Sequence, residues 1–158
     1  MGKPVIYIDG KEGTTGLQIY DRLAGREDIV LLLIDEDRRK DAAERKKLMN
    51  AADLVFLCLP DAAAVEAAAL VENPGTRIID ASTAHRTAPG WVYGFPELGP
   101  DRRAAIRGAK RVANPGCYAT GFISLTAPLV KRGVLSPDAP LACHAVSGYT
   151  GGGKKAIA

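Results

Sequence analysis

Short apolar runs alternate along this chain with stretches whose apolar residues recur at helical spacing. Residues 29–34, for example, are apolar without interruption, which is typical of a parallel strand covered on both faces. The predicted strands are residues 5–9, 29–34, 54–59, 77–80 and 111–113. The predicted helices are residues 17–24, a short stretch that ends at Asn50, and residues 62–72 and 101–107. Strands that alternate with helices in this way predict an α/β fold, a doubly wound parallel sheet of the Rossmann-like kind.

The pattern changes after residue 117. Residues 118–132 are compatible with a helix that ends at Gly133, and residues 141–147 are predicted to form a strand. We therefore expect the sheet domain to give way near residue 117 to the opening elements of a second domain.

A long irregular segment, residues 81–99, interrupts the regular alternation before this change. It contains the only tryptophan of the chain and one of its two histidines, His85. Irregular segments of this length inside compact domains are usually functional.

Composition narrows the classes of function. Hydrophobic residues make up 47% and charged residues 25% of the chain, which is ordinary for a globular protein. The net charge is +3 without a long block of lysine or arginine, which favours small anionic ligands over nucleic acid. No apolar run has the length of a membrane span or of a signal-peptide core, so no membrane partner is expected. Three cysteines form neither a disulfide framework nor a zinc motif, which favours a reducing cytoplasm.

Three glycines follow the first predicted strand and precede the first predicted helix. Gly10, Gly13 and Gly16 are spaced three apart, which departs from the usual dinucleotide motif, but their place between strand and helix suits backbone N–H groups that receive a pyrophosphate. Thr14 and Thr15 add hydroxyl donors. The alternative is a tight turn without a ligand.

Residues after the next three strands are candidates for the same cofactor. Asp35 would bind a ribose hydroxyl and favour NAD, whereas Arg38 and the adjacent Arg39 and Lys40 would pair with a 2′-phosphate and favour NADP. Local chemistry leaves this choice open, and solvated charges are the alternative for the basic residues. Pro60 and Ser82 would face the cofactor crevice or serve only as turn residues.

Cys117 is the candidate nucleophile. It follows Asn114, Pro115 and Gly116, at the start of a predicted helix, where unpaired N–H groups and the helix dipole stabilise a thiolate. The alternative is a buried, unreactive thiol. Cys58 and Cys143 lie within predicted strands, and burial is expected for both.

Other polar residues have weaker signals. Arg86, in the irregular segment, is better placed than His85 to bind an acidic substrate, although solvent exposure explains it equally well. His144 is expected to be structural, and neither histidine has the spacing of a metal ligand. Residues 151–155, Gly-Gly-Gly-Lys-Lys, would form an anion-binding loop or a glycine-rich turn.

Taken together, the motifs resemble one family. The stretches that carry the resemblance are residues 10–16, 57–60, 80–87, 93–97, 114–117 and 147–155. Read together, they resemble the short form of N-acetyl-γ-glutamyl-phosphate reductase, an enzyme family of arginine biosynthesis. That family is similar in fold and chemistry to the aspartate-semialdehyde and glyceraldehyde-phosphate dehydrogenases.

The resemblance implies a function for the sites above. It implies an oxidoreductase of the cytoplasm, a homo-oligomer that uses NADP(H) to reduce an acyl phosphate to an aldehyde through a Cys117 thioester. Backbone N–H groups, with Asn114, would stabilise the oxyanion, and Arg86 would bind an acidic group of the substrate.

The resemblance also implies a domain division. Residues 1–117 would be the dinucleotide-binding domain, and residues 118–158 the start of an α+β substrate domain. Family members are about twice as long and carry a catalytic histidine in their second half, so this chain alone is expected to be weak or inactive. Two alternatives stay open: a related substrate, aspartyl phosphate or carrier-linked α-aminoadipyl phosphate, and a nucleotide-binding module without catalysis.

Overall fold

The core of the molecule is a six-stranded parallel sheet. The computed structural model describes residues 2–11, 13–148 and 151. The strand order is β2-β1-β3-β4-β6-β5, with every neighbouring pair parallel. The strands are β1 Val5–Asp9, β2 Val30–Leu32, β3 Leu54–Leu57, β4 Arg77–Asp80, β5 Val92–Tyr93 and β6 Arg111–Ala113. The predicted doubly wound α/β architecture is therefore confirmed.

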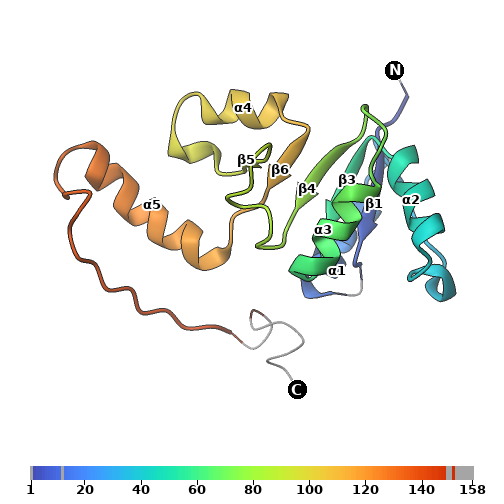
Figure 1. Ribbon diagram of the computed structural model, residues 1–158, viewed down its shortest axis with the longest axis horizontal. Coiled ribbons are helices and arrows are strands. Elements are labelled where there is room, and N and C mark those ends of the chain that lie inside the picture. Colours follow the sequence, from blue (N-terminus) through green and yellow to red (C-terminus); the bar gives the residue numbers. More distant parts are fainter. Residues whose placement is uncertain (1, 12, 149–150, 152–158) are drawn as a thin grey trace.

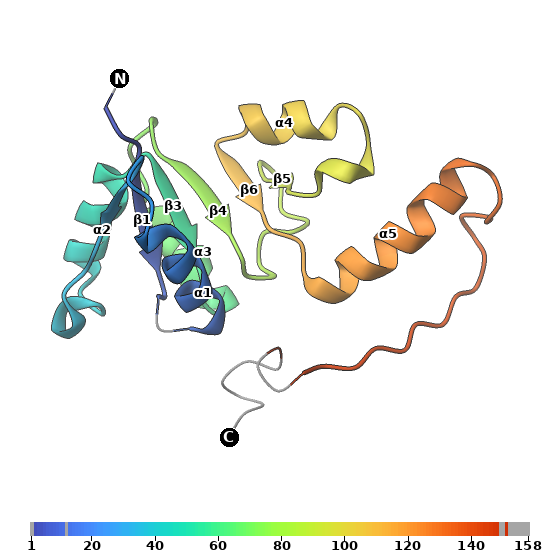
Figure 2. The same cartoon turned by 180° about the vertical axis from the view of Figure 1, so that it is seen from behind.

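Helices cover both faces of the sheet. The helices are α1 Thr14–Ala24, α2 Ala42–Ala51, α3 Asp61–Leu70, α4 Arg102–Gly108 and α5 Cys117–Lys131, with 3-10 turns at Glu36–Arg38 and Pro96–Leu98. In Figures 1 and 2, α3 lies in front of one face of the sheet and α1 in front of the other.

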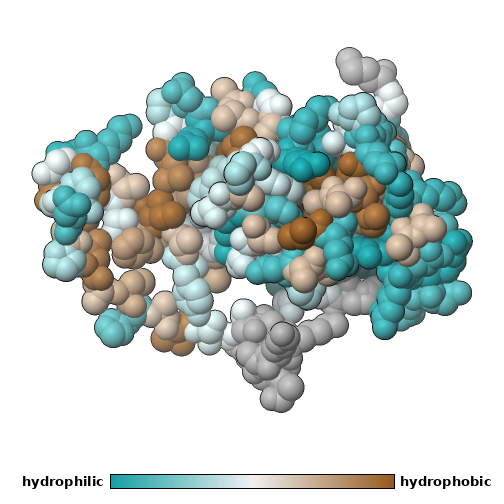
Figure 3. Space-filling model, in the orientation of Figure 1, coloured by the Kyte–Doolittle hydropathy of each residue, from teal (hydrophilic) through white to brown (hydrophobic). Residues whose placement is uncertain are grey.

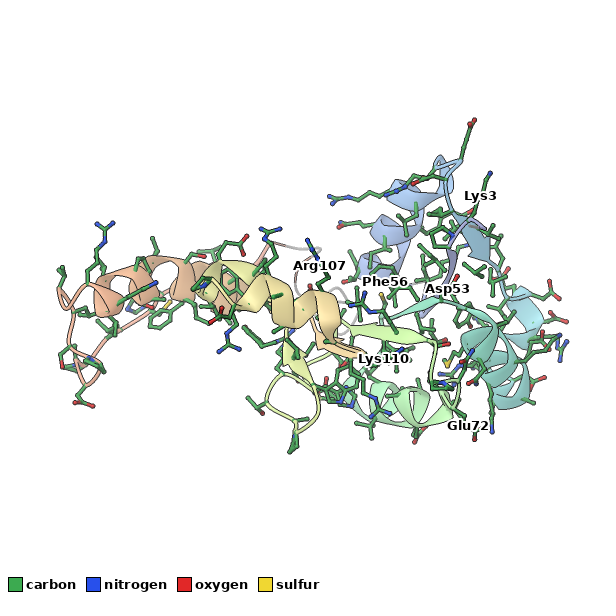
Figure 4. The ribbon with its side chains drawn as sticks, turned by 90° about the horizontal axis from the view of Figure 1, so that it is seen from above. Lys3, Asp53, Phe56, Glu72, Arg107 and Lys110 are labelled. Atoms are coloured by element: carbon green, nitrogen blue, oxygen red, sulfur yellow. The ribbon has the colours of Figure 1, made fainter. Side chains whose placement is uncertain are left out.

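The main apolar core lies on the face that carries α2 and α3. Val55 and Leu57 of β3 pack there with Met49 of α2 and Ala67 of α3, and all four are fully buried. Phe56 alternates with Val55 and Leu57, so its side chain points to the opposite face of the sheet (Figure 4). Phe56 is only half-buried.

Both edges of the sheet differ from the prediction. Residues 29–34 were expected to be covered on both faces, but β2 is an edge strand of three residues in which Val30 is 41% exposed. At the other edge, Val92 and Tyr93 form β5 inside the segment expected to be irregular, and they pair with β6. An apolar run shows that a residue suits a strand, but not which strand has a neighbour on each side.

The predicted strand at residues 141–147 is wrong, because the structure assigns no strand there. Leu141 is 49% and Val146 is 96% exposed, and Cys143, which was expected to be buried, is exposed. His144 is exposed as well. A strand needs a neighbour for its backbone hydrogen bonds, and among the described residues this segment has none.

Helix α5 projects from the sheet rather than packing on it (Figures 1 and 4). None of its residues is buried. Its apolar side chains Tyr118, Phe122, Leu125 and Leu129 recur at helical spacing and are between 37% and 74% exposed. Figure 3, which is coloured by residue, accordingly shows hydrophobic residues on the surface in the α5 region.

Candidate functional site

Loops from four parallel strands meet at the carboxyl edge of the sheet, where open α/β sheets bind their ligands. The glycine loop follows β1, Pro60 comes three residues after β3, Ser82 comes two residues after β4, and the turn to Cys117 follows β6. The fold therefore brings the sequence-predicted residues of these four loops to one edge.

The glycine loop is pressed against neighbouring backbone. Gly10 has φ +85°, and a Cβ built on it would lie 2.3 Å from the carbonyl oxygen of Cys58. A Cβ on Gly16 would lie 2.3 Å from the carbonyl oxygen of Gly10. No side chain fits at either position, so the two glycines are required for this path of the chain whether or not a ligand binds.

The start of α1 suits an anion. Gly13 is the N-cap, no side chain caps the helix, and the first turn contains no acidic residue. Thr14 is half-buried and Thr15 is exposed. The first N–H groups of α1, together with these hydroxyl groups, therefore form a donor-rich surface of the kind that binds a pyrophosphate.

A buried pair beside this loop was not apparent from the sequence. Asp9, the last residue of β1, is 4% exposed and accepts a hydrogen bond of 2.6 Å from Nη2 of Arg45 in α2. The Asp9 carboxylate raises the pKa of Arg45 above its usual value, chiefly through this hydrogen bond. The pair fixes α2 to the strand that leads directly into Gly10.

Asp80, the last residue of β4, organises the loop that follows. Its side chain is fully buried and accepts hydrogen bonds from the Ser82 N–H at 3.0 Å and the Ser82 hydroxyl at 2.6 Å. Nδ1 of His85 lies 2.6 Å from Asp80 Oδ2. Ser82 thus takes part in the turn chemistry considered above, and only 7% of its surface is exposed. Pro60 is exposed and is the N-cap of α3.

His85 is buried within this loop. Its ring stacks on Trp91, with centroids 4.0 Å apart and an interplanar angle of 14°. With Asp80 on one side and Trp91 on its face, the imidazole holds the start and the end of the loop together. The next residue, Arg86, leaves the loop toward the cysteine turn.

Arg86 spans the gap between two loops. Its Nε donates to the carbonyl oxygen of Asn114 at 3.1 Å, and its Nη2 donates to the carbonyl oxygen of Ala81 at 3.5 Å. A Cβ built on Gly116 would lie 2.7 Å from Nη1 of Arg86, so the guanidinium lies directly against the residue before Cys117. The structure therefore brings together Arg86, Asn114 and Cys117, which the sequence had suggested separately.

Cys117 is the first residue of α5 and is exposed. Gly116 is the N-cap, no side chain caps the helix, and the first turn contains no acidic residue. The Asn114 N–H donates to the Asp80 carbonyl oxygen at 2.7 Å, and the Asn114 side-chain amide donates to the Pro115 carbonyl oxygen at 3.2 Å. Asp80 therefore also supports the backbone of the cysteine turn.

Cys58 is a contrasting thiol. It is half-buried behind the glycine loop, where burial above all, and then the nearby carboxylates of Asp80 and Asp9, raise its pKa to about 12. Near neutral pH it is therefore a thiol rather than a thiolate.

Two candidate features are not brought to Cys117 by the structure: Arg38, and the segment of residues 151–155. Arg38 forms ion pairs with Asp41 at 3.1 Å and Glu44 at 2.9 Å at the start of α2. The segment of residues 151–155 lies, except for Gly151, outside the described residues.

Two further properties of the described part of the chain can be stated. Its histidine, cysteine and acidic side chains form no group of three that could hold a metal ion. Within residues 2–11, 13–148 and 151, no helix has the length and apolar character needed to cross a bilayer.

Two family models match the chain. One, described as "semialdehyde dehydrogenase, NAD binding domain", matches residues 33–106. The other, described as "semialdehyde dehydrogenase, dimerisation domain", matches residues 117–158.

Curated relatives match nearly the whole chain. It is 57% identical over 157 residues to N-acetyl-gamma-glutamyl-phosphate reductase of Trichormus variabilis and, over the same length and at the same identity, to N-acetyl-gamma-glutamyl-phosphate reductase 2 of Pseudomonas putida. Each match covers 99% of this chain but only 49% and 50% of the respective relative. The chain thus spans about half the length of these relatives.

A solved structure shares the fold at low sequence identity. The crystal structure of aspartate semialdehyde dehydrogenase II from Vibrio cholerae, complexed with ASA, superposes with a TM-score of 0.67 at 16% identity. The match covers 99% of this chain and 50% of that one.

Proposed function

We propose that the chain belongs to the semialdehyde dehydrogenase family, two of whose models match it, and that its protein reduces N-acetyl-γ-glutamyl phosphate to N-acetylglutamate semialdehyde with NADPH, a step of arginine biosynthesis. The observation that carries the proposal is the meeting of an exposed Cys117, at an uncapped helix start, with Arg86 at the edge that also carries the glycine loop. A thiol, a cation and an anion-binding loop are among the parts that this reaction needs.

The residues at this edge fit a nicotinamide dinucleotide. Gly10 and Gly16 allow the loop its tight path against neighbouring backbone, and the first turn of α1, with Thr14 and Thr15, would receive the pyrophosphate. Gly13, Pro60 and Ser82 would border the same crevice, and Arg38 is the sequence-based candidate for the 2′-phosphate. The bound cofactor would supply the hydride.

Cys117 would carry the covalent chemistry. Its thiolate adds to the acyl-phosphate carbonyl carbon, and the carbon–oxygen bond to phosphate then breaks, with both electrons leaving on phosphate, to give a thioester. After the carbonyl carbon is reduced, the carbon–sulfur bond of the thiohemiacetal breaks, which releases the aldehyde and regenerates the thiol.

Neighbouring groups would stabilise charge in these steps. The N–H groups of the first turn of α5 are uncapped and would donate to the developing oxyanion, together with the Asn114 side chain. Arg86 presents its guanidinium against Gly116 and would pair with the free carboxylate of the substrate.

The assembly and location follow the same proposal. Residues 1–117 would form the dinucleotide-binding domain and residues 118–158 the first part of the substrate domain. We expect the protein to be a homo-oligomer, since residues 117–158 match a dimerisation domain, and the family resemblance implies a cytoplasmic location.

Trapping of the acyl-enzyme tests the proposal directly. The chain is mixed with N-acetyl-γ-glutamyl phosphate, quenched in acid and digested, and mass spectrometry should find an acyl adduct on Cys117. The adduct should be absent from Cys117→Ser, whereas Cys143→Ser keeps it. An Arg86→Ala variant should need a higher substrate concentration for the same adduct.

Competing substrates and cofactor binding complete the test. Aspartyl phosphate should acylate Cys117 more slowly, and a preference for it would change the substrate assignment. Titration with NADPH should show saturable binding by wild type. Absence of both the adduct and NADPH binding would contradict the proposed function.

A further inference from the structure

A hollow lies beside the glycine loop, at the end of β2. Its volume is about 160 Å³. Residues of β1, α1 and the end of β2 line it, together with the charged side chains of Lys11, Glu36 and Arg39. Its two cationic side chains come from different segments, Lys11 from the glycine loop and Arg39 from the turn after β2. Of the residues that the sequence pointed to at this place, Arg39 is part of the lining, whereas Asp35, Arg38 and Lys40 are not.

The two cationic side chains differ in how they are held. Lys11 directly follows Gly10, and its Nζ lies 4.1 Å from the centroid of the Tyr20 ring. Arg39 has an acidic neighbour in Glu36, but the two charged groups are 3.9 Å apart and the Glu36 side chain is 88% exposed. Such an exposed, long ion pair is weak, so an anion in the hollow can replace Glu36 as the partner of Arg39.

Arg38 has a different environment. Its Nη2 lies 3.1 Å from Asp41 and 2.9 Å from Glu44, and the pKa of Arg38 is raised, first by the hydrogen bond to Asp41 and then by the charge of Glu44. Asp41 is the N-cap of α2 and accepts from the N–H groups of Ala43 and Glu44. Two carboxylates therefore balance the Arg38 charge, and its contacts fix the start of α2.

We infer that Arg39 and Lys11, rather than Arg38, hold the 2′-phosphate of NADP(H) and select it over NAD(H). The inference rests on the proposed function. The end of β2 is where the ribose 2′-position lies when the pyrophosphate occupies the start of the first helix of such a sheet. A guanidinium matches two phosphate oxygens with its paired N–H groups, and Lys11 of the glycine loop adds a second cation to the same hollow.

The test isolates the phosphate with two small probes. Adenosine 2′,5′-bisphosphate and adenosine 5′-monophosphate differ only in the 2′-phosphate, so the ratio of their dissociation constants, measured by isothermal titration calorimetry, reports that group alone. Wild type should bind the bisphosphate at least about tenfold more tightly. Arg39→Ala and Lys11→Gln should each lower this ratio severalfold while affinity for the monophosphate stays the same.

Arg38→Ala is the matched control, because it removes the same charge one residue away. It should keep the ratio of wild type and lower the melting temperature by loosening the start of α2. NADPH and NADH should be titrated in the same way. The ratio of their dissociation constants should change among the variants as the ratio of the two probes does.

Three results would overturn the inference. If Arg38→Ala lowers the ratio as much as Arg39→Ala, the sequence-based candidate holds the phosphate. If wild type binds both probes equally, the chain binds nucleotides but does not select NADP(H) over NAD(H) through the 2′-phosphate. If wild type binds neither the probes nor NADPH, the proposed nucleotide binding fails together with the inference.

Discussion

Asp80 connects the two loops of the candidate site. Its carboxylate holds Ser82 and His85, and its backbone carbonyl accepts the N–H of Asn114 in the cysteine turn. Arg86 follows His85 directly and reaches the same turn. The position of Arg86 beside Cys117 therefore depends on a carboxylate that contacts neither of them.

Removal of the Asp80 carboxylate should destabilise the folded chain. Asp80→Ala leaves the Ser82 and His85 donors without their buried partner, and we expect a loss of about 2–4 kcal/mol in the free energy of unfolding. Urea titration followed by circular dichroism measures it. Asp61→Ala is the control, since Asp61 also accepts hydrogen bonds, from Thr83, but is exposed and should cost much less. An equal loss of unfolding free energy in the two variants would show that Asp80 does not stabilise the loop more than an exposed carboxylate does.

The three cysteines should differ in reactivity. Cys58 has a pKa raised to about 12, so its thiolate fraction grows only as the pH approaches that value. Iodoacetamide at pH 7–9 should modify the exposed Cys117 and Cys143 of the folded chain and leave Cys58 unmodified, with all three reacting in urea. Cys117 should react faster than Cys143, because only Cys117 lies at a helix start. Peptide mass mapping reads the sites, and a slower Cys117 would count against its assignment as nucleophile.

At the scale of elements, the glycine loop is the most constrained segment. A methyl group at Gly16 would overlap the Gly10 carbonyl, so Gly16→Ala should destabilise the chain by about 2 kcal/mol or more and weaken nucleotide binding. Gly25→Ala is the matched control, because a Cβ at Gly25 meets nothing within 4 Å. Thermal unfolding and NADPH titration measure both variants, and equal behaviour would contradict the role given to the loop.

The elements were predictable where a local pattern sufficed. The runs at residues 5–9, 54–59 and 77–80 became β1, β3 and β4, because central strands are apolar whatever their partners are. Residues 141–147 and β5 were not predictable, because strand formation depends on a neighbouring strand that the local sequence does not reveal.

The site was predictable to a similar degree. Gly10, Gly16 and Cys117 carry local signals, a glycine before a helix and a cysteine after Pro-Gly, and the structure places the two glycines against backbone and Cys117 at the start of α5. The contacts of Asp80 with His85 and of Arg86 with Asn114 join loops that follow different strands. Such contacts exist only once the strand order is fixed, so no sequence spacing indicates them.

At the scale of the whole molecule, the chain exposes more surface than its mass requires. The accessible surface is 10480 Å². A compact monomer of this mass would expose about 7,600 Å². Helix α5, which has no buried residue and carries four exposed apolar side chains on one side, contributes to this difference together with the mostly exposed residues 132–148.

Dye binding should report this apolar stripe. Leu125 is 74% exposed, so Leu125→Lys should reduce the fluorescence of bound anilinonaphthalene sulfonate without lowering the melting temperature. Ser124→Lys, one residue away and off the stripe, should leave the dye signal unchanged. A melting temperature that falls with Leu125→Lys would mean that the side chain is packed in solution.

Trp91 is the only indole of the chain, and it is stacked on His85 in the loop that carries Arg86. Its emission therefore comes from one known place. Reduced nicotinamide absorbs in the range where an indole emits, so energy transfer to an arriving dinucleotide would dim that emission. Trp91 is thus an intrinsic fluorescent probe of this chain, and dinucleotide binding in the crevice can be followed in real time without an attached label.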